Sequence, residues 1–301
     1  MDQKNAARPG RLVVAGLGYG GTAAAAEAAA AGWQVTGTAR DPAKAAPPPG
    51  VAVVAFAEAA PAILAATHLL VTAAPDAAGD PVLGAHAAAI RAAPDLRWVG
   101  YVSTTGVYGD RGGAWVDEAT APAPAQDRSR RRLAAEQAWA ALANHLAVDL
   151  MRAGGIYGPG RSVVEELRAG TARRTVKPGH CFSRIHRDDI ALAVGAALRQ
   201  ALPAGLRVLH LVDDEPAEAA LVVEEAARLL GVPPPPAIAF AQAERGLSPM
   251  GRSFWRENRK VANAATKAAL GIAWRYSTYR EGLVQIVAET GFVAGTGFAK
   301  R

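Results

Sequence analysis

Short apolar runs alternate with longer segments of helical spacing along most of the chain. The short runs end at glycine, proline or polar residues, which is typical of buried strands. They lie at residues 12–15, 33–38, 51–54, 68–74, 96–103, 147–152 and 206–212. The longer segments predict helices at residues 22–31, 58–67, 81–93, 128–144, 162–170, 190–201 and 218–230, with a mostly helical tail over 260–289. No hairpin dipeptide joins two runs, so we predict parallel strands covered by helices on both faces.

A glycine-rich turn joins the first predicted strand to the first predicted helix. Gly16, Gly18 and Gly21 fit the G-x-G-x-x-G spacing of a dinucleotide-binding turn. The first glycine permits the turn, the second lets backbone approach a pyrophosphate, and the third lets helix and strand pack closely. The helix then directs free N–H groups and its positive dipole end at the phosphates. The flanking strands and helix match this motif, so we predict a dinucleotide site; the alternative is a turn that binds nothing.

The residues after the second predicted strand decide which nicotinamide cofactor is expected. An acidic residue there binds the ribose 2′-hydroxyl of NAD, whereas an arginine accommodates the 2′-phosphate of NADP. Arg40 stands at this point, and Asp41 follows it before Pro42. Asp41 can instead begin a turn, because aspartate before proline favours turns. We therefore predict NADP as the cofactor, with NAD as the alternative.

These patterns predict an α/β fold, in which a Rossmann doubly wound parallel sheet is joined to a smaller C-terminal substrate lobe. The alternation of strand and helix changes beyond Arg161. We assign residues 1–160 to an NAD(P)-binding Rossmann domain, to which residues 184–213 return. The substrate lobe is assigned to residues 161–183 and 214–301, facing the carboxyl edge of the sheet.

The composition indicates a sizeable core without a covalent framework. Hydrophobic residues make up 50% of the 301 residues. The single cysteine, Cys181, excludes a disulfide framework and favours a reducing compartment. Residues 1–11 are polar, so no signal peptide is expected, and no uncharged apolar run reaches the roughly 20 residues of a membrane span. We expect a cytoplasmic protein without a membrane partner.

The net charge of +6 comes from 33 basic and 27 acidic residues spread along the chain. The one dense cluster lies at residues 128–132, where four of the five residues are arginine. Such a cluster can contact nucleic acid, but no nucleic-acid recognition fold is predicted. Anionic cofactor and substrate groups explain a modest positive balance equally well. We therefore expect a small-molecule substrate and no nucleic acid.

Several motifs together resemble the extended short-chain dehydrogenase/reductase superfamily, of the nucleotide-sugar epimerase and dehydratase kind, and in particular its atypical branch. Besides the glycine turn, the resemblance is carried by residues 103–109 (STTGVYG), 152–160 (RAGGIYGPG), 184–191 (RIHRDDIA), 211–216 (LVDDEP) and 270–271 (LG). It implies a nicotinamide cofactor and a polar small-molecule substrate, a sugar nucleotide being one class. Related enzymes often dimerise through helices that correspond here to residues 81–93 and 128–144.

The resemblance also implies catalytic residues, and this chain departs from them. In the family, a Ser or Thr at the position of Thr104 hydrogen-bonds the reacting oxygen, and a Tyr-x-x-x-Lys on the next helix supplies the acid/base. The lysine, one turn along the helix, stabilises a phenolate whose ordinary pKa is about 10. Here Arg132 takes the position of the lysine and Arg128 that of the tyrosine. Arginine does not deprotonate in proteins, so Arg128 cannot be a general base.

Three residues can replace the missing acid/base. Tyr108 lies close in sequence to Thr104, although the corresponding tyrosine of the family usually packs. His186 either titrates near neutrality at the edge of the expected pocket or is a hydrogen-bonded structural histidine ahead of a helix. Asp110 either faces the crevice as a base or forms a turn. The catalytic candidates are Thr104, Tyr108, Arg132 and His186.

Arginines supply the candidate substrate contacts. Arg128 and Arg132 either clamp an anionic substrate or the cofactor ribose, or form a solvated basic start to a helix, where cations are unfavourable to the dipole. Arg184 either binds a substrate phosphate, as the resemblance implies, or is a lone surface arginine. Asp188 and Asp189 are expected to cap the helix that follows them. No Cys/His spacing matches a zinc site, so no metal is predicted.

The expected cofactor contacts gather at the carboxyl ends of the predicted strands. They are Gly16, Gly18, Tyr19, Gly20, Gly21, Arg40, Ala73 and Ser103. Two functions stay open. One is an NAD(P)-dependent oxidoreductase or epimerase in which Thr104 polarises the substrate oxygen, favoured by a complete substrate lobe. The other is a non-catalytic NADP(H)-binding sensor, favoured by the loss of the Tyr-x-x-x-Lys pair.

Overall fold

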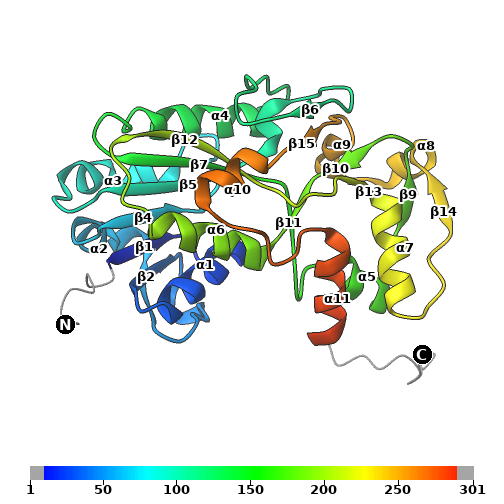
Figure 1. Ribbon diagram of the computed structural model, residues 1–301, viewed down its shortest axis with the longest axis horizontal. Helices are drawn as coiled ribbons and strands as arrows, with labels where there is room; N and C mark the ends of the chain where they lie inside the picture. The colour runs from blue at the N-terminus through cyan, green and yellow to red at the C-terminus, as the bar shows by residue number, and fades with distance from the viewer. Residues whose placement is uncertain (1–9, 290–301) are drawn as a thin grey trace.

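The computed structural model describes residues 10–289. The expectation that the chain has no signal peptide rests mostly on residues 1–9, which lie outside the described residues. Figure 1 shows a sheet flanked by helices on one side of the molecule and a smaller group of helices on the other.

The largest element is a sheet of seven parallel strands in the order β12-β7-β5-β4-β1-β2-β3. Each strand coincides with an apolar run that predicted it. The strands are β1 (Arg11–Ala15), β2 (Gln34–Ala39), β3 (Val51–Ala55), β4 (His68–Val71), β5 (Trp98–Thr104), β7 (Ala147–Ala153) and β12 (Gly205–Leu211). The strand order reverses at β1 and β4, the switch point beyond whose carboxyl ends such sheets bind ligands. The predicted doubly wound sheet is confirmed.

Helices cover both faces of this sheet (Figure 1). On one face lie α1 (Tyr19–Ala30), α6 (Arg187–Leu198) and α10 (Ala264–Leu270). There the alanines of α1 share a core with Ile190 and Val194 of α6, and their small side chains let the two helices approach closely. The other face is covered by α2 (Ala60–Leu64), α3 (Pro81–Ala92) and α4 (Asp127–Ala140), which bury Ile63, Ile90 and Trp139 against the strands.

A separate, smaller core lies in the C-terminal part of the molecule. It is enclosed by α5 (Val163–Arg168), α7 (Ala219–Leu229) and α11 (Tyr279–Glu289). Val164, Val223, Tyr279, Leu283 and Ile286 are buried in it. The assignment of residues 161–183 and 214–301 to a substrate lobe stays a prediction.

Short strand pairs connect this part to the large sheet. They are β8 (Gly155–Tyr157) with β11 (Arg184–His186), β9 (Arg174–Val176) with β14 (Ala237–Ala239), β10 (Cys181–Phe182) with β13 (Ala217–Glu218), and β6 (Trp115–Val116) with β15 (Lys260–Val261). Two short helices, α8 (Phe240–Ala243) and α9 (Pro249–Phe254), follow β14.

The tail over residues 260–289, expected to be mostly helical, contains α10 and α11 but begins with the short strand β15. Elsewhere, residues 110–127 contain the short strand β6, and residues 41–50 contain a 3-10 turn at Pro42–Lys44. A strand of two residues is too short to show a hydrophobic period. Its formation depends on the strand with which it pairs, so the local sequence pattern does not predict it.

Candidate functional site

The turn between β1 and α1 has the geometry that its glycines predict. Gly16 has a φ of +111°, and a Cβ placed there would lie 2.8 Å from the Thr72 hydroxyl oxygen. A Cβ on Gly21 would lie only 2.3 Å from the carbonyl oxygen of Gly16. Gly18 differs, because a Cβ there would meet no atom within 4 Å. The first and third glycines are therefore required by packing, whereas Gly18 borders open space.

The N-terminus of α1 begins at this turn without a side-chain cap. Gly18 is the N-cap residue, and the first turn of the helix carries no acidic residue. The turn is tied to β2, since Gly16 donates its N–H to the Thr38 hydroxyl at 3.0 Å and Leu17 donates to the Thr38 carbonyl at 3.1 Å. The free N–H groups at such a helix start are a site for anionic groups.

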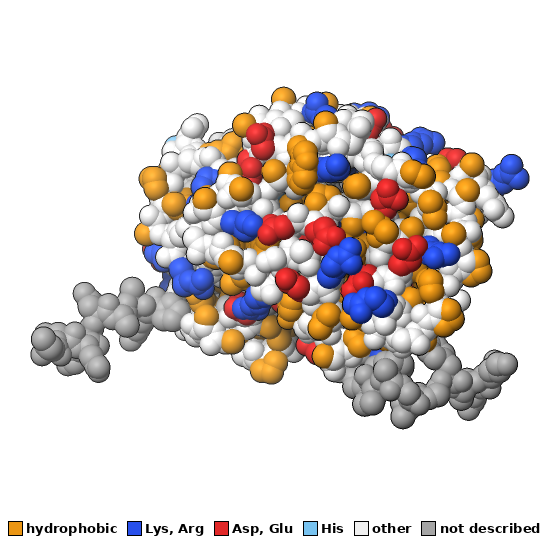
Figure 2. All heavy atoms as spheres, turned by 45° about the vertical axis from the view of Figure 1, so that its right-hand side comes forward, with side chains coloured by type: hydrophobic (Ala, Val, Ile, Leu, Met, Phe, Trp, Pro, Cys, Tyr) orange, Lys and Arg blue, Asp and Glu red, His pale blue; other side chains and the backbone are white. Residues whose placement is uncertain are grey.

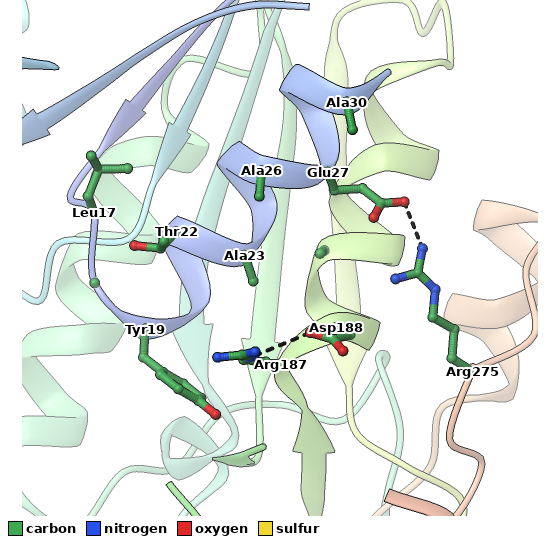
Figure 3. Close-up of a pocket in the computed structure, with 12 residues that line it drawn as sticks. Leu17, Tyr19, Thr22, Ala23, Ala26, Glu27, Ala30, Arg187, Asp188 and Arg275 are labelled. Carbon is green, nitrogen blue, oxygen red and sulfur yellow. Dashed lines mark hydrogen bonds and ion pairs between the residues drawn. The ribbon is translucent and has the colours of Figure 1, made fainter. Parts of the chain in front are cut away.

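Tyr19 stands at the start of α1, directly after Gly18. Its hydroxyl donates to the carbonyl oxygen of Pro159 at 2.8 Å, and the guanidinium groups of Arg161 and Arg187 lie over its ring. The ring lines a groove of about 730 Å³ between α1 and α6 (Figure 3). Gly20 faces Ile190 of α6. Tyr19 and Gly20 therefore join α1 to its neighbours.

Arg40 and Asp41 have separate environments at the end of β2. The Arg40 side chain is exposed and makes no hydrogen bond or ion pair among residues 10–289. The Asp41 carboxylate accepts the N–H of Ala43 at 3.2 Å and pairs with Lys44 at 3.0 Å. Asp41 thus caps the 3-10 turn, as its alternative interpretation predicted. The arginine is the group left available for a ligand.

Ala73 and Thr104 follow the carboxyl ends of β4 and β5. Ala73 donates its N–H to the carbonyl oxygen of Ala15, which places it beside the glycine turn. Thr104 accepts the N–H of Gly106 at 3.1 Å, and its hydroxyl proton has no acceptor among residues 10–289. The structure brings Ala73 to the glycine turn, and it leaves the Thr104 hydroxyl able to donate.

The Ser103 hydroxyl, expected at the cofactor, is instead engaged inside the protein. It donates to the Glu136 carboxylate, which also forms an ion pair with Arg152 at 2.6 Å. All three side chains are buried, and they come from β5, α4 and β7. Neighbouring residues of a strand point to opposite faces, so the Thr104 side chain points the other way from Ser103.

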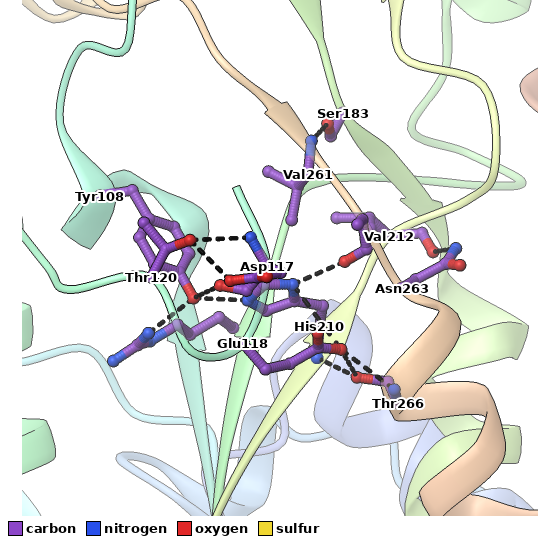
Figure 4. Close-up of polar contacts among 12 residues, drawn as sticks. Tyr108, Asp117, Glu118, Thr120, Ser183, His210, Val212, Val261, Asn263 and Thr266 are labelled. Carbon is purple, nitrogen blue, oxygen red and sulfur yellow. Dashed lines mark hydrogen bonds and ion pairs between the residues drawn. The ribbon is translucent and has the colours of Figure 1, made fainter. Parts of the chain in front are cut away.

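Tyr108 belongs to the same buried network and is completely buried, at 0% exposure. Its hydroxyl accepts from Arg152 at 2.7 Å and bonds to Nε2 of His210 at 2.5 Å, and His210 Nδ1 lies 2.6 Å from the Ala262 carbonyl oxygen. Figure 4 shows Tyr108 and His210 facing each other. Burial raises the pKa of Tyr108. These contacts favour the packing interpretation over an acid/base role.

His186 is likewise buried at 0% exposure and caps α6. Its Nδ1 accepts the N–H of Asp188 at 3.2 Å, and its ring packs edge-on against Tyr157 and Tyr276. Burial lowers the pKa of His186, so the ring is neutral near pH 7. This geometry favours the structural interpretation.

The expectation that Asp188 or Asp189 caps α6 was wrong, because the preceding histidine already supplies the cap. Asp189 instead accepts the N–H groups of Arg275 and Tyr276, at 2.6 and 3.2 Å. Asp110 forms a turn, since its carboxylate accepts the N–H groups of Gly112 and Asn258. These hydrogen bonds lower the pKa of Asp110.

The arginines at the family's catalytic positions have different surroundings. Arg132 donates to the Tyr101 hydroxyl and to the Val102 carbonyl oxygen, both at 3.0 Å, which holds it against the end of β5. Arg128 lies with its guanidinium 3.9 Å from the ring centre of Phe254 in α9. Arg132 is thus positioned beside β5, whereas Arg128 faces the C-terminal part.

Arg184 lies away from this group, on β11. It donates to the carbonyl oxygens of Phe182 and Ala217, at 2.8 and 3.0 Å, and lines a second cavity of about 230 Å³. Tyr157 and Tyr279 also line this cavity, and no sequence pattern predicted either of them as a site residue. They lie more than a hundred residues apart and share no motif, so no local signal could have joined them.

Two general features of the described residues bear on the site. No group of three or more His, Cys, Asp or Glu side chains gathers within residues 10–289 in a way that could hold a metal ion. Within the same residues, none of the helices combines the length and the apolar character needed to cross a bilayer.

No protein-family model matches the chain. Among curated proteins, the 3-diazoavenalumate denitrifying reductase of a Streptomyces species is 34% identical over 146 residues, which are 46% of this chain and 46% of that protein. The alignment therefore spans less than half of either protein.

Solved structures match over nearly the whole length. A conserved protein of unknown function from Silicibacter pomeroyi DSS is 42% identical, with a TM-score of 0.83, covering 93% of this chain and 99% of that chain. A candidate NAD-dependent epimerase/dehydratase from Methylobacillus flagellatus is 25% identical, with a TM-score of 0.70, covering 94% and 99%. The human epimerase family protein SDR39U1 with NADPH shares the fold at 21% identity and a TM-score of 0.72, covering 92% and 99%. The chain is therefore similar over nearly its whole length to a protein of the NAD-dependent epimerase/dehydratase kind, as its motifs predicted, and it shares the fold of the epimerase family protein.

Proposed function

We propose that this protein is an NAD(P)-dependent oxidoreductase or epimerase that acts on a polar small molecule, with sugar nucleotides as one substrate class. The observation that carries the proposal is the glycine turn. It needs glycine at residues 16 and 21, leaves open space at Gly18 and presents an uncapped helix start. A backbone with these features can take up a pyrophosphate. The NADPH held by a protein of the same fold supports a nicotinamide dinucleotide.

NADP is the proposed cofactor in preference to NAD. Arg40 follows β2 and has no hydrogen-bond or ion-pair partner among the described residues, whereas the Asp41 carboxylate is occupied by its own turn. A planar guanidinium binds phosphate oxygens by charge-assisted hydrogen bonds. The adjacent acid therefore does not compete for the ribose.

The residues around the end of β5 would orient the substrate. The nicotinamide group, when bound, supplies or accepts a hydride. Thr104 would donate its free hydroxyl proton to the reacting oxygen of the substrate. Arg132, held by Tyr101 and Val102, would supply a permanent positive charge where the family has lysine. Arg128 and Arg184 stay the proposed substrate contacts.

Proton transfer is the step for which the described residues provide the least support. Tyr108 and His186 stay the predicted acid/base residues, but both are buried and hydrogen-bonded. Either side chain would have to break these contacts to reach a substrate. This observation favours a second candidate function, a non-catalytic NADP(H)-binding sensor.

One experiment tests both functions. The protein is titrated with NADPH and NADH by calorimetry, and the absorbance of the reduced cofactor is then followed with a panel of carbonyl compounds and sugar nucleotides. We expect NADPH to bind and at least one substrate to oxidise it. Binding without turnover or a burst of oxidation would support the sensor. Failure of both cofactors to bind would contradict both functions. The predicted homodimer through α3 and α4 is tested separately by sedimentation.

A further inference from the structure

The first turn of α4 packs against the short turn that follows Thr104. The hydroxyl oxygen of Ser129 would lie 3.0 Å from a Cβ on Gly106, and Gly106 donates its N–H to the Thr104 hydroxyl at 3.1 Å. One helical turn after Arg128, Arg132 donates to a backbone carbonyl oxygen of β5. The backbone of Arg128 therefore lies beside the residues that are proposed to orient the substrate.

The side chain of Arg128 extends from there to the C-terminal part of the molecule. Its guanidinium lies 3.9 Å from the ring centre of Phe254 in α9, which Figure 1 shows between α4 and α7. Gln126 ties α9 to the start of α4, because its Nε2 donates to the carbonyl oxygen of Ser253 at 2.8 Å. A guanidinium held on an aromatic face keeps its N–H groups available for other partners.

The N–H groups of Arg128 have no partner in the part of the chain that the structure describes. Arg128 is half-buried and makes no hydrogen bond or ion pair among residues 10–289. Burial lowers the pKa of its guanidinium, and Glu257 opposes this effect. Glu257 does not neutralise it, because this carboxylate forms its ion pair with Arg259 at 2.9 Å. A charge that is partly removed from water without a partner indicates an anion that the protein itself does not supply.

Arg259 adds to the positive surroundings of Arg128. Its Nη1 donates to the carbonyl oxygen of Gly109, which ends the turn that follows β5, at 2.8 Å. Burial lowers the pKa of Arg259, and the charge of Arg128 lowers it further, so the two guanidinium groups are close enough to repel each other. The nearby Asp110 carboxylate is engaged by two backbone N–H groups. An anion bound by Arg128 would relieve this repulsion.

The apolar surface next to Arg128 limits the rest of the ligand. Met250 and Phe254 lie one helical turn apart on α9 and are 67% and 52% exposed. Arg132 is proposed to act at the reacting oxygen, so Arg128 is the one charge left for an acidic group. A single guanidinium matches the single charge and the two oxygens of a carboxylate better than the nearly double charge of a phosphate group.

We propose that Arg128 binds a carboxylate of the substrate, and that Phe254 is the positioning residue that holds Arg128 for this contact. The apolar part of the substrate lies against Met250. This inference rests on the proposed function, in which Arg128 is a substrate contact. It narrows the polar small molecule to a carboxylic acid and gives α9 a role in specificity. At the position of the family's tyrosine, this chain then carries a group that binds the substrate and transfers no proton.

The test is a calorimetric titration of the whole chain with benzoate, with benzamide as its uncharged match and phenyl phosphate as the alternative anion. We expect benzoate to bind at least tenfold more tightly than benzamide. Arg128→Met should bring the ratio of the two affinities close to one. Phe254→Leu should lower the ratio at least threefold, whereas Phe254→Tyr keeps the ring and should keep the ratio. Arg130→Met removes an exposed arginine from the opposite side of the same helix and should leave the ratio unchanged.

A wild-type ratio in Arg128→Met would overturn the proposal, as would failure of benzoate to bind. Equal ratios in Phe254→Leu and Phe254→Tyr would overturn the positioning role, and this pair still decides if Arg128→Met fails to fold. Tighter binding of phenyl phosphate than of benzoate, lost in Arg128→Met, would overturn the choice of a carboxylate.

These outcomes are separable from those of the cofactor experiment. Gly18→Val should keep full benzoate affinity, which excludes the glycine turn as the site of the anion. Benzoate binding without any cofactor binding would leave Arg128 assigned and remove the proposed function. Cofactor turnover without benzoate binding would remove the Arg128 site alone.

Discussion

At the residue scale, the glycine turn contains two glycines that the fold itself requires and one, Gly18, that only a bound ligand would require. Gly16 and Gly21 are needed by the protein itself, because a Cβ on either would collide with neighbouring atoms. Gly18 has a φ of −80° and open space around it, so any residue could stand there in the folded chain. A requirement for glycine at this position therefore comes from a bound group.

Gly18→Val should remove cofactor binding while leaving the fold intact. The added side chain would occupy the space through which a pyrophosphate approaches the backbone. We expect affinity for both NADPH and NADH to fall at least tenfold in calorimetry, with no more than a small change in Tm. The matched control is Gly205→Val, which is also free of contacts within 4 Å. Equal cofactor affinity in the two variants would contradict the assignment of the turn.

Arg40→Asp should change cofactor preference. Hydrogen bonds to a charged group contribute roughly 1.5–3 kcal/mol, so NADPH affinity should fall about 10- to 100-fold. NADH lacks the 2′-phosphate, and its affinity should change little or improve. The ratio of the two dissociation constants is the measurement, with Asp41→Asn as the neighbouring control. Equal losses for both cofactors would remove the case for NADP.

At the element scale, one buried ion pair joins two strands of the large sheet to a helix that covers it. Glu136 of α4 pairs with Arg152 of β7 and accepts from Ser103 of β5, and Arg152 also contacts Tyr108. This network includes Tyr108, one of the catalytic candidates. It explains why the hydroxyls of Ser103 and Tyr108 are not free for ligands. It also fixes the position of β5, which carries Thr104.

Glu136→Gln should strongly destabilise the protein, because it leaves the Arg152 charge buried without a partner. Removing one member of a buried pair typically costs about 3–5 kcal/mol. Urea denaturation at pH 7 measures the loss. Asp127→Asn breaks the exposed pair between Asp127 and Arg130 on the same helix and should have a much smaller effect. Similar losses in the two variants would show that the buried network is not a stabilising unit.

At the scale of the whole molecule, charged side chains of both signs are mixed on the surface, and several of the groups with shifted pKa values are buried histidines and aspartates. On the face shown in Figure 2, basic and acidic side chains are interspersed, so the net charge of +6 is not concentrated there. Inside, burial lowers the pKa values of His68, His186 and His210. It raises those of Asp189 to about 6 and Asp213 to about 8.

Stability should therefore fall as pH rises from 7 to 8, chiefly through Asp213. Between the unfolded pKa of 3.8 and the folded value of about 8, the folded chain holds a proton that the unfolded chain has lost. The slope can reach about 1.4 kcal/mol per pH unit. The histidines act with the opposite sign, but only below their ordinary pKa of about 6.5. Urea midpoints at pH 7, 7.5 and 8 measure the decline.

Asp213→Asn should flatten this decline and stabilise the protein at pH 8, because an amide carries no charge to desolvate. Its carbonyl oxygen can still accept the N–H of Glu215, as Asp213 does. The exposed neighbour provides the control, and Asp214→Asn should keep the wild-type slope. An unchanged slope in Asp213→Asn would assign the pH dependence to other groups.

Much of the fold was predictable because its signals are local. Apolar runs of strand length predicted every strand of the large sheet. The helical spacing of the segments between these runs, together with the turn at Gly16, predicted that the strands are parallel and covered by helices. The missed elements are pairs of two or three residues, such as β6 with β15, whose partners lie far apart in sequence. Loop-closing contacts of this kind leave no periodic pattern.

For the candidate site, sequence alone determined which groups are available: a glycine turn suited to phosphates, an arginine after β2, and no tyrosine in the family's catalytic position. Only the tertiary structure decided their surroundings. It buried Tyr108 and His186 in hydrogen bonds and gave the Ser103 hydroxyl to Glu136. It also brought Tyr157, Arg184 and Tyr279 around one cavity. The physical reason is that backbone turns are local properties, whereas burial, pKa and hydrogen-bond partners depend on residues that meet only in the folded chain.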